Sequence, residues 1–300
     1  MDHLPDIPEA RRVKTITVIT PCFNAEKYIE ETIHSVINQS AVKEGRLALN
    51  YWVIDGGSSD RTVEIVKRYE SQGVSLISEK DAGMYDALVK GFARAKGDAC
   101  CYINAGDYFH PQAFDVVKDV FEAQPDVKWL TGMAVKYNER SQVIHFYLPK
   151  RFFRRSIRRG YYGRVQPHIQ QESTFWRTEL LQLVDMDKLR KLRYAGDFLL
   201  WHSFSQRHDL IIVASQLGGF KVHAGQLSSA MDKYTRELEE ICGTRLGWLD
   251  RLLGKLDKLA MLMPSRSFLI PIGYDKVVRW DYKHQCWSTP GQITRADHHD

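Results

Sequence analysis

The first half of the chain alternates between short, β-rich apolar runs and segments with helical periodicity. TITVIT (15–20), YWVID (51–55), VSLIS (74–78) and CCYIN (100–104) are expected to be strands. Apolar residues in the intervening segments recur at spacings of three and four, which predicts amphipathic helices. This alternation constrains the fold most strongly, because strands joined by helices form a parallel sheet that is covered on both faces.

Four helices are expected beside these strands. The first has Asn24 as its candidate N-cap and the second begins near Ser59 and Asp60, because short polar side chains accept hydrogen bonds from free N–H groups at helix starts. The third covers 84–95 and the fourth covers 111–123. Each has an apolar stripe with which it can cover the sheet.

Length and composition suit a globular protein. The 300 residues, 44% of them hydrophobic, suffice for one large α/β domain or for one domain with an appendage. No apolar run approaches the roughly 18–20 residues that span a bilayer, and residues 1–12 contain no apolar signal region. The five cysteines form no CxxC pair, which suits a reducing compartment. We therefore expect a cytoplasmic protein.

Polar residues stand where the expected strands end. Residues 21–24 follow the first strand, 55–58 follow the second, and Asp107 follows the fourth. Ligands of such sheets bind beyond the carboxyl ends of the strands, so these residues are expected to meet at one edge. The chain has neither a GxGxxG turn nor a GxxxxGK[ST] loop, which disfavours a dehydrogenase or a kinase. Carboxylates at this edge can bind a base or ribose and a hard cation.

Four stretches resemble one known family. ITVITPCFNAEKYIEETIHSVINQ, VIDGGSSDRTVEIVKRY, EKDAGMYDALVKGFARAKGD and INAGD follow one another across residues 15–110. Together they resemble family 2 of the GT-A glycosyltransferases, of the bacterial surface-polysaccharide type, whose members are inverting enzymes that use nucleotide-diphosphate sugars. The resemblance implies an α/β fold of the GT-A type, with a Rossmann-like, mostly parallel sheet flanked by helices and, in this chain, a helical C-terminal extension.

The resemblance also implies roles for residues at the sheet edge. Asp55 would hold the base of the nucleotide, and the loop from Pro21 to Asn24 would wall its pocket. INAGD would be the DxD-type motif, in which Asp107 binds Mn²⁺ or Mg²⁺, and His223 in a late loop would complete the metal site. The implied nucleotide-sugar contacts are Pro21, Phe23, Asn24, Asp55, Asp81, Asp86, Asn104, Ala105 and Gly106.

Two positions depart from the family pattern. The first DxD position is Asn104, which removes one ligand charge, although an amide can still bond ribose or a metal-bound water. Val89 stands where many relatives have Asn. Asn104 therefore favours one alternative, a non-catalytic nucleotide-sugar or glycan-binding module of the same fold.

Two later segments resemble the acceptor side and the catalytic base of the family. PHIQQESTFWR (167–177) resembles the acceptor-side segment, with His168, Gln170 and Glu172 as the implied contacts. YAGDFLLW (194–201) resembles the place where members have a catalytic carboxylate at a helix start. Asp197 is therefore the implied general base, and Glu172 is the alternative base.

Each of these residues also has a purely structural interpretation. Asp55 can order a turn with the glycines that follow it. Asp86 can be a first-turn helix acid, and Asp197 can be a helix cap. His168 can be a loop histidine, and His223 can be a surface imidazole.

The last part of the chain has a different pattern. A GT-A domain over 12–230 and a helical or irregular extension over 231–300 are expected. Within 245–263 leucines recur at helical spacing, which is typical of a packing face or of a helix lying on a membrane. Residues 149–164 contain seven basic residues and no acid, which favours an anionic membrane. Nucleic acid is not among the expected partners, although such a block can also bind single strands.

The expected reaction is an inverting transfer of a hexosyl or N-acetylhexosaminyl group from a nucleotide-diphosphate sugar, with UDP as the expected nucleotide. The expected acceptor is a glycan or a lipid-linked glycan in polysaccharide or lipopolysaccharide synthesis. Asp197 would take the proton of the acceptor hydroxyl. The cation on Asp107 would stabilise the departing diphosphate.

Overall fold

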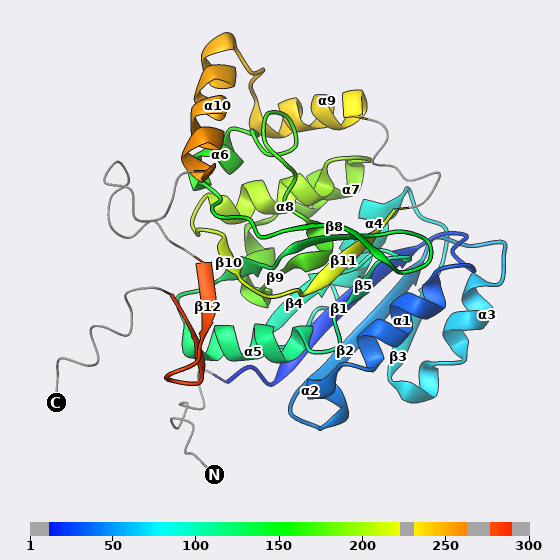
Figure 1. Cartoon of the computed structure of the whole chain (residues 1–300). Coiled ribbons are helices and arrows are strands. Elements are labelled where there is room, and N and C mark those ends of the chain that lie inside the picture. The colour runs from blue at the N-terminus through cyan, green and yellow to red at the C-terminus, as the bar shows by residue number, and fades with distance from the viewer. Residues whose placement is uncertain (1–11, 223–230, 263–276, 290–300) are drawn as a thin grey trace.

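The computed structural model describes residues 12–222, 231–262 and 277–289. A nine-stranded sheet runs through the molecule, and a four-stranded sheet lies beside it (Figure 1). In spatial order the large sheet consists of Cys286–Ser288 (β13), Val277–Asp281 (β12), Ile211–Val213 (β10), Trp129–Thr131 (β6), Thr174–Arg177 (β9), Ala99–Tyr102 (β4), Thr15–Cys22 (β1), Ala48–Asp55 (β2) and Val74–Ser78 (β3). The small sheet consists of Tyr108–Phe109 (β5), Gly218–Lys221 (β11), Ala134–Tyr137 (β7) and Val143–Tyr147 (β8).

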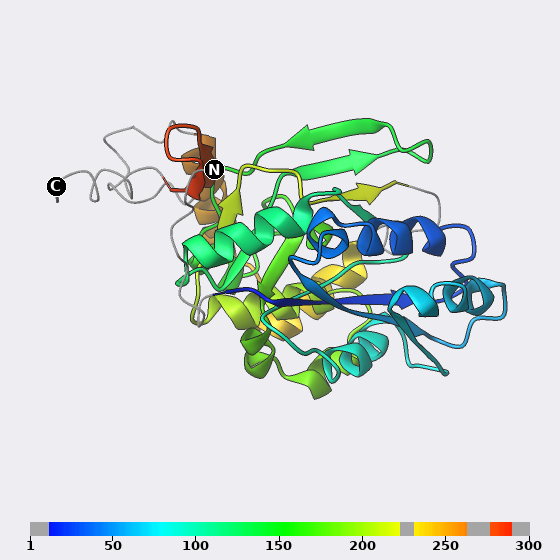
Figure 2. The same cartoon turned by 90° about the horizontal axis from the view of Figure 1, so that it is seen from below.

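Helices cover both faces of the large sheet. The helices of the described residues are Ile29–Ile37 (α1), Ser40–Lys43 (α2), Thr62–Lys67 (α3), Met84–Phe92 (α4), Ala113–Ala123 (α5), Arg154–Arg158 (α6), Met186–Lys191 (α7), Gly196–Ser205 (α8), Met231–Cys242 (α9) and Trp248–Leu262 (α10). Short 3₁₀ turns lie at Glu70–Gln72 (η2), Gln171–Ser173 (η3) and Thr178–Leu183 (η4). Figure 2 shows α1 and α5 on one side of the sheet and α4, α7 and α8 on the other.

The parallel half of the sheet confirms the four expected strands. β1 pairs in parallel with β2 and with β4, and β2 pairs in parallel with β3. From Ile16 to Cys22 every residue of β1 is buried, as expected of a central strand that is covered on both faces. β9 is antiparallel to both β4 and β6, so the complete sheet is mixed.

The expected helices are present, but Asn24 does not cap the first. α1 begins only at Ile29, with Tyr28 at its N-cap, because residues 25–28 first form a turn in which the N–H of Tyr28 donates to the carbonyl of Ala25 at 2.9 Å. Asn24 has a φ of 48°, which Asn tolerates better than most residues, and its Oδ1 accepts from the N–H of Ser59 at 2.9 Å. This contact ties the loop after β1 to the loop after β2.

An aromatic cluster joins the second half of the sheet to α8. Trp129 of β6 stacks on Trp201 of α8 with ring centroids 5.6 Å apart, and Trp176 of β9 meets Trp201 edge-on at 5.9 Å. Phe204, one helical turn later, packs against both sheet tryptophans. Buried aromatic pairs of this kind add packing energy beyond the area they bury, so the cluster fixes α8 on the sheet.

The C-terminal part of the chain is helical and then returns to the sheet. After α9 and α10, β12 pairs in parallel with β10, and β13 pairs in antiparallel fashion with β12. Val277 and Val278 are buried there. The helical C-terminal extension is therefore completed by two sheet strands, while the expected boundary at residue 230 lies outside the described residues. None of the helices described is long and apolar enough to cross a membrane.

Candidate active site

A cavity of about 1390 Å³ lies beyond the carboxyl ends of β1, β2 and β4. The loop after β1, the backbone at Gly56, the loop before α4 and the turn after β4 line it. The segment before β9 and the start of α8 line it as well. Segments distant in the sequence thus meet at the edge where the fold predicts a ligand site.

Most of the expected site residues line this cavity. They are Pro21, Phe23, Asn24, Asp81, Asn104, Ala105, Asp107, His168, Gln170, Glu172 and Asp197. Asp55, Asp86 and Gly106 do not line it. His223 lies outside the described residues.

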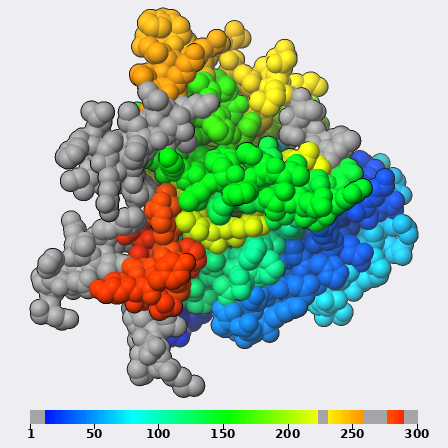
Figure 3. All heavy atoms as spheres, in the orientation of Figure 1, coloured from blue at the N-terminus to red at the C-terminus, as the bar shows by residue number. Residues whose placement is uncertain are grey.

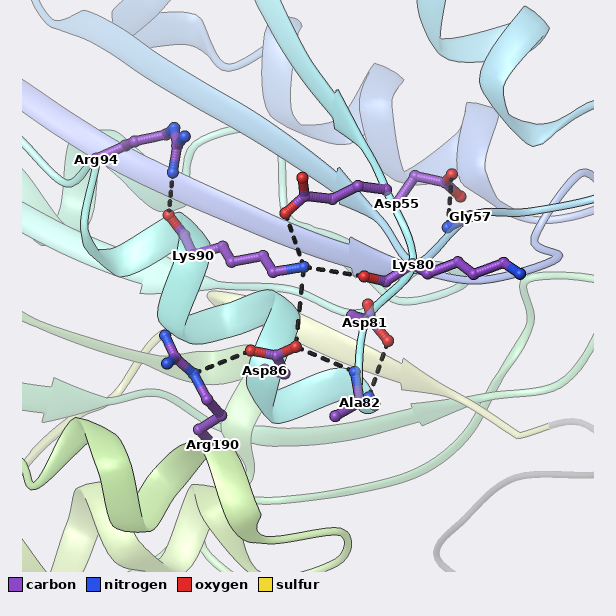
Figure 4. Close-up of polar contacts among 11 residues, drawn as sticks. Asp55, Gly57, Lys80, Asp81, Ala82, Asp86, Lys90, Arg94 and Arg190 are labelled. Atoms are coloured by element: carbon purple, nitrogen blue, oxygen red, sulfur yellow. Dashed lines mark hydrogen bonds and ion pairs between the residues drawn. The ribbon is translucent and has the colours of Figure 1, made fainter.

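Asp55 is fully buried behind the cavity wall. Its Oδ2 accepts from the N–H of Gly57 at 3.1 Å (Figure 4). It also accepts from the N–H of Ser58 at 3.1 Å and from the Ser78 hydroxyl at 2.7 Å. The Ser58 hydroxyl also donates to Oδ1. These bonds match the turn-ordering interpretation, and the backbone of Gly56 reaches the cavity instead. A Cβ at Gly56 would lie 2.7 Å from the Asp81 carboxylate, so any larger residue would require the Asp81 side chain to shift.

Asp86 braces the loop that precedes α4. It accepts from the N–H of Ala82 at 3.0 Å and pairs with Arg190 of α7 at 3.0 Å (Figure 4). Asp81, on the same loop, faces the cavity and accepts from the N–H of Gly83 at 2.8 Å. Desolvation raises the pKa of Asp81. Asp86 thus supports the wall of which Asp81 is a part.

The turn after β4 presents Asp107 and Asn104 to the cavity. Gly106 has a φ of 111°, and its N–H donates to the Thr32 hydroxyl at 2.9 Å, which places it behind the turn. Asp107 is buried, its Oδ1 accepts from the N–H of Lys221 at 2.9 Å, and burial raises its pKa to about 7. The buried Oδ1 of Asn104 has no hydrogen-bond partner in the part of the chain that the structure describes.

Two more carboxylates face the same cavity. Glu172 is buried, its Oε1 lacks a partner among the described residues, and desolvation followed by the charge of Asp107 raises its pKa well above the usual range. Asp197 lies in the first turn of α8, and enclosure by protein raises its pKa to about 7. Ala195 is the N-cap of α8, so Asp197 does not occupy the cap position. Its Oδ1 accepts from the adjacent N–H of Phe198 at 2.7 Å.

A carboxylate that no sequence motif indicates holds the start of α8. Glu237 of α9 accepts from the N–H of Arg193 through Oε1, and from those of Tyr194 and Ala195 through Oε2, all at 2.8 Å. These groups immediately precede the helix that bears Asp197. Glu237 is about forty residues away in sequence and has no local motif, so only the tertiary fold reveals the contact.

Cations and aromatic side chains that the motifs did not indicate also line the cavity. Lys136 and His145 face one another across β7 and β8, and both reach the cavity. Arg193 lies beside Gly83 and also lines the cavity. Tyr234 of α9 meets the ring of His168 edge-on at 5.1 Å. Lys136 and Arg193 form no ion pair with a described residue, which leaves positive charge for an anionic ligand.

The model of the family named Glycosyl transferase family 2 matches residues 17–178. An uncharacterized glycosyltransferase of Mycobacterium tuberculosis, MT1564, is 37% identical over 109 residues, which cover 36% of this chain and 39% of the relative. The putative teichuronic acid biosynthesis glycosyltransferase TuaG of Bacillus subtilis is 32% identical over 98 residues, which cover 31% of this chain and 36% of TuaG. The chain thus matches less than half the length of these relatives.

Solved structures extend the similarity to most of the fold. Residues 1–349 of Staphylococcus aureus TarS, in complex with UDP-GlcNAc, match with a TM-score of 0.58 at 17% identity, over 82% of this chain and 72% of that one. The mannosyltransferase PcManGT of Pyrobaculum calidifontis, in complex with GDP-Man and Mn²⁺, matches with a TM-score of 0.51 at 18% identity, over 77% and 63% of the two chains. These neighbours confirm the expected GT-A fold. Because the family model covers more than half of the chain, the protein belongs to glycosyl transferase family 2.

Proposed function

We propose that the protein is an inverting glycosyltransferase that moves a hexosyl or N-acetylhexosaminyl group from a nucleotide-diphosphate sugar to a glycan acceptor. The observation that supports this most directly is the meeting of Asp107 and Asp197 in one cavity, although 90 residues separate them. Asp107 can act on the leaving diphosphate through a bound cation, while Asp197 can accept the proton of the attacking hydroxyl. Family membership and the UDP-GlcNAc complex of TarS support a nucleotide-sugar donor, with UDP as the proposed nucleotide.

In this proposal the acceptor hydroxyl oxygen attacks the anomeric carbon. The bond from that carbon to the diphosphate oxygen breaks, the configuration inverts, and the hydroxyl proton passes to Asp197. A base works best when its pKa is close to the working pH, and the pKa of Asp197 is about 7. Lys136 and Arg193 are the cations placed to balance the charge of the diphosphate.

Asp107 and Asn104 would hold a divalent cation, Mn²⁺ or Mg²⁺. The buried Asp107 carboxylate and the unpartnered Oδ1 of Asn104 fit a cation that is shared with the phosphates of the donor, because Mg²⁺ is commonly bound by one or two carboxylates plus substrate phosphates. Within residues 12–222, 231–262 and 277–289, no three His, Cys, Asp or Glu side chains form a metal cluster. When bound, the cation would neutralise charge on the leaving diphosphate. We keep His223 as a proposed further ligand.

The proposed nucleotide contacts form two groups, those that line the cavity and those behind it. Pro21, Phe23, Asn24 and Asp81 are proposed to touch the nucleotide directly, since they line the cavity. Asp55 is proposed to act through the turn whose Gly56 backbone reaches the cavity. On the acceptor side, His168, Gln170 and Glu172 are the proposed contacts, with Glu172 as the alternative base.

The proposed biological setting is the assembly of a bacterial surface polysaccharide, lipopolysaccharide included, on a lipid-linked acceptor at the cytoplasmic face of a membrane. The similarity to TuaG, named for teichuronic acid biosynthesis, supports a cell-surface polymer. The alternative of a non-catalytic sugar-binding module is favoured by Asn104 at the first DxD position.

One experiment separates the enzyme from the binding module. The purified protein is incubated with a panel of nucleotide sugars, with manganese and then with excess chelator, and both donor hydrolysis and thermal protection are measured. Turnover of one donor that needs the metal supports the proposal, and Asp107→Ala should abolish it. Thermal protection without turnover of any donor would favour the non-catalytic module. Full turnover in excess chelator would contradict the proposed role of the cation.

A further inference from the structure

α10 has its polar face toward the protein and its apolar face toward solvent. On the inner face, Asp250 accepts from Arg159 at 2.7 Å and from the Tyr161 hydroxyl at 3.1 Å. Asp257 is buried and is bonded by Arg155 and Ser156. Ion pairs thus attach the helix to α6 and the loop after it, whereas the inner face of an amphipathic helix is usually apolar.

The outer face presents a continuous apolar strip. Trp248, Leu249, Leu252, Leu253 and Leu256 are 74%, 53%, 47%, 42% and 52% exposed. These positions recur at helical spacing, so the side chains lie along one side of α10. Figures 1 and 3 show α10 projecting from the body of the molecule at the top of the view. Contiguous exposed apolar surface of this kind marks an interaction site.

Charge around the strip favours an anionic partner. Both acids in the part of α10 whose side chains are described are paired on the inner face, whereas Arg251 and Lys255 are exposed and form no ion pair with a described residue. Arg158 of the adjacent α6 is likewise exposed. A second copy of this chain seated on the strip would bring these cations against one another, which disfavours self-association.

We propose that α10 lies on an anionic phospholipid surface, with the apolar strip in the boundary between headgroups and acyl chains and with Arg251 and Lys255 at the phosphates. Helices with leucine and tryptophan on one face and cations on the other bind membranes in this way. Membrane contact through α10 would bring the cavity to the lipid-linked acceptor, which is the one element taken from the proposed function. Binding itself requires neither donor nor acceptor.

Vesicle flotation tests the strip directly. The full chain should float with vesicles of phosphatidylglycerol and phosphatidylcholine and bind vesicles of phosphatidylcholine alone roughly 10-fold more weakly. The variant Trp248→Ser/Leu252→Ser/Leu256→Ser should bind the anionic vesicles roughly 100-fold more weakly, because three anchoring side chains are lost. Arg251→Gln/Lys255→Gln should lose most of the preference for anionic lipid. The matched control is Tyr282→Ser, which removes an aromatic side chain that is 83% exposed on another surface.

Three outcomes would overturn the inference. One is failure of the full chain to float, and another is equal flotation by the full chain and the serine variant. The third is a dimer in light scattering that the serine variant abolishes, which would assign the strip to a second copy. Flotation uses no sugar donor, so a failed transfer assay leaves this test unaffected. Retained thermal stability of the serine variant, expected because the side chains are exposed, excludes unfolding as the cause.

Discussion

The cavity carboxylates and Asp55 illustrate how differently one chemical group can be used. Asp107, Glu172 and Asp197 share a cavity in which burial raises the pKa of each. Binding of a cation, or uptake of the proton of an acceptor hydroxyl, is therefore favourable in this cavity. The oxygens of Asp55 instead accept hydrogen bonds from its own loop and from β3.

Asp197→Asn tests the proposed base at the residue scale. Asn keeps the shape but cannot accept the proton, so transfer should fall by roughly 10²–10⁴-fold while donor affinity and stability change little. Single-turnover transfer and donor titration measure the two effects. Near-normal transfer would move the base elsewhere, with Glu172→Gln as the next variant.

The pH dependence of transfer follows from the same residue. The raised pKa of Asp197, about 7, means that the carboxylate is largely protonated below that pH and ionised above it. Transfer by the wild-type protein should therefore rise with pH through about 7 and then level off. A rate that is flat from pH 5 to 8 under single-turnover conditions would contradict a base with this pKa.

Asp55→Ala separates a structural role from base recognition. Removal of a buried carboxylate that accepts several hydrogen bonds should lower the free energy of unfolding by about 2–4 kcal/mol, measured by urea denaturation. Asp81→Ala is the matched variant at the cavity surface. It should leave stability nearly unchanged and weaken nucleotide binding by about tenfold. Full stability with lost binding in Asp55→Ala would instead support direct contact with the base.

At the scale of elements, the hydrogen bonds between Glu237 of α9 and the backbone just before α8 determine where the proposed base lies. Glu237→Gln removes the charge that faces three N–H groups before α8, and this charge also helps to raise the pKa of Asp197. We expect transfer to fall by about tenfold and its pH midpoint to move to lower pH. Glu240→Gln, on the exposed side of the same helix, is the control. A slower rate with an unmoved midpoint would limit Glu237 to fixing the position of α8.

Local periodicity explains which elements were predictable. Residues 15–20, 51–55, 74–78 and 100–104 were recognised because a buried strand has a short, apolar, β-rich sequence whatever lies next to it. The orientation of α10 could not be predicted, because amphipathic spacing does not tell which face of a helix turns inward. Here Arg155 and Arg159 pair with the acids of its inner face. The contact from Glu237 and the inward side chain of Asp55 depend on segments distant in sequence or on turn geometry.

At the scale of the whole molecule, β12 extends the large sheet beyond β10. Val278→Asp would place an unpaired carboxylate at a fully buried position beside β10 and should lower the free energy of unfolding by about 3–5 kcal/mol. Urea denaturation measures this loss, and light scattering reports any aggregation. Tyr282→Asp, just past the same strand and exposed, should change neither. Equal stability of the two variants would show that β12 contributes little to the fold.

The late position of β12 also has a consequence for synthesis. β10 is complete at Val213, but its parallel neighbour begins only at Val277. While the ribosome makes the residues between them, one edge of the sheet carries unpaired backbone groups, which invite pairing with another chain. Domains fold as their residues emerge, at about 5–20 residues per second, so this open edge would persist for several seconds on each nascent chain. Crowded polysomes and rapid overexpression should therefore favour misassembly of this protein even when the finished fold is stable.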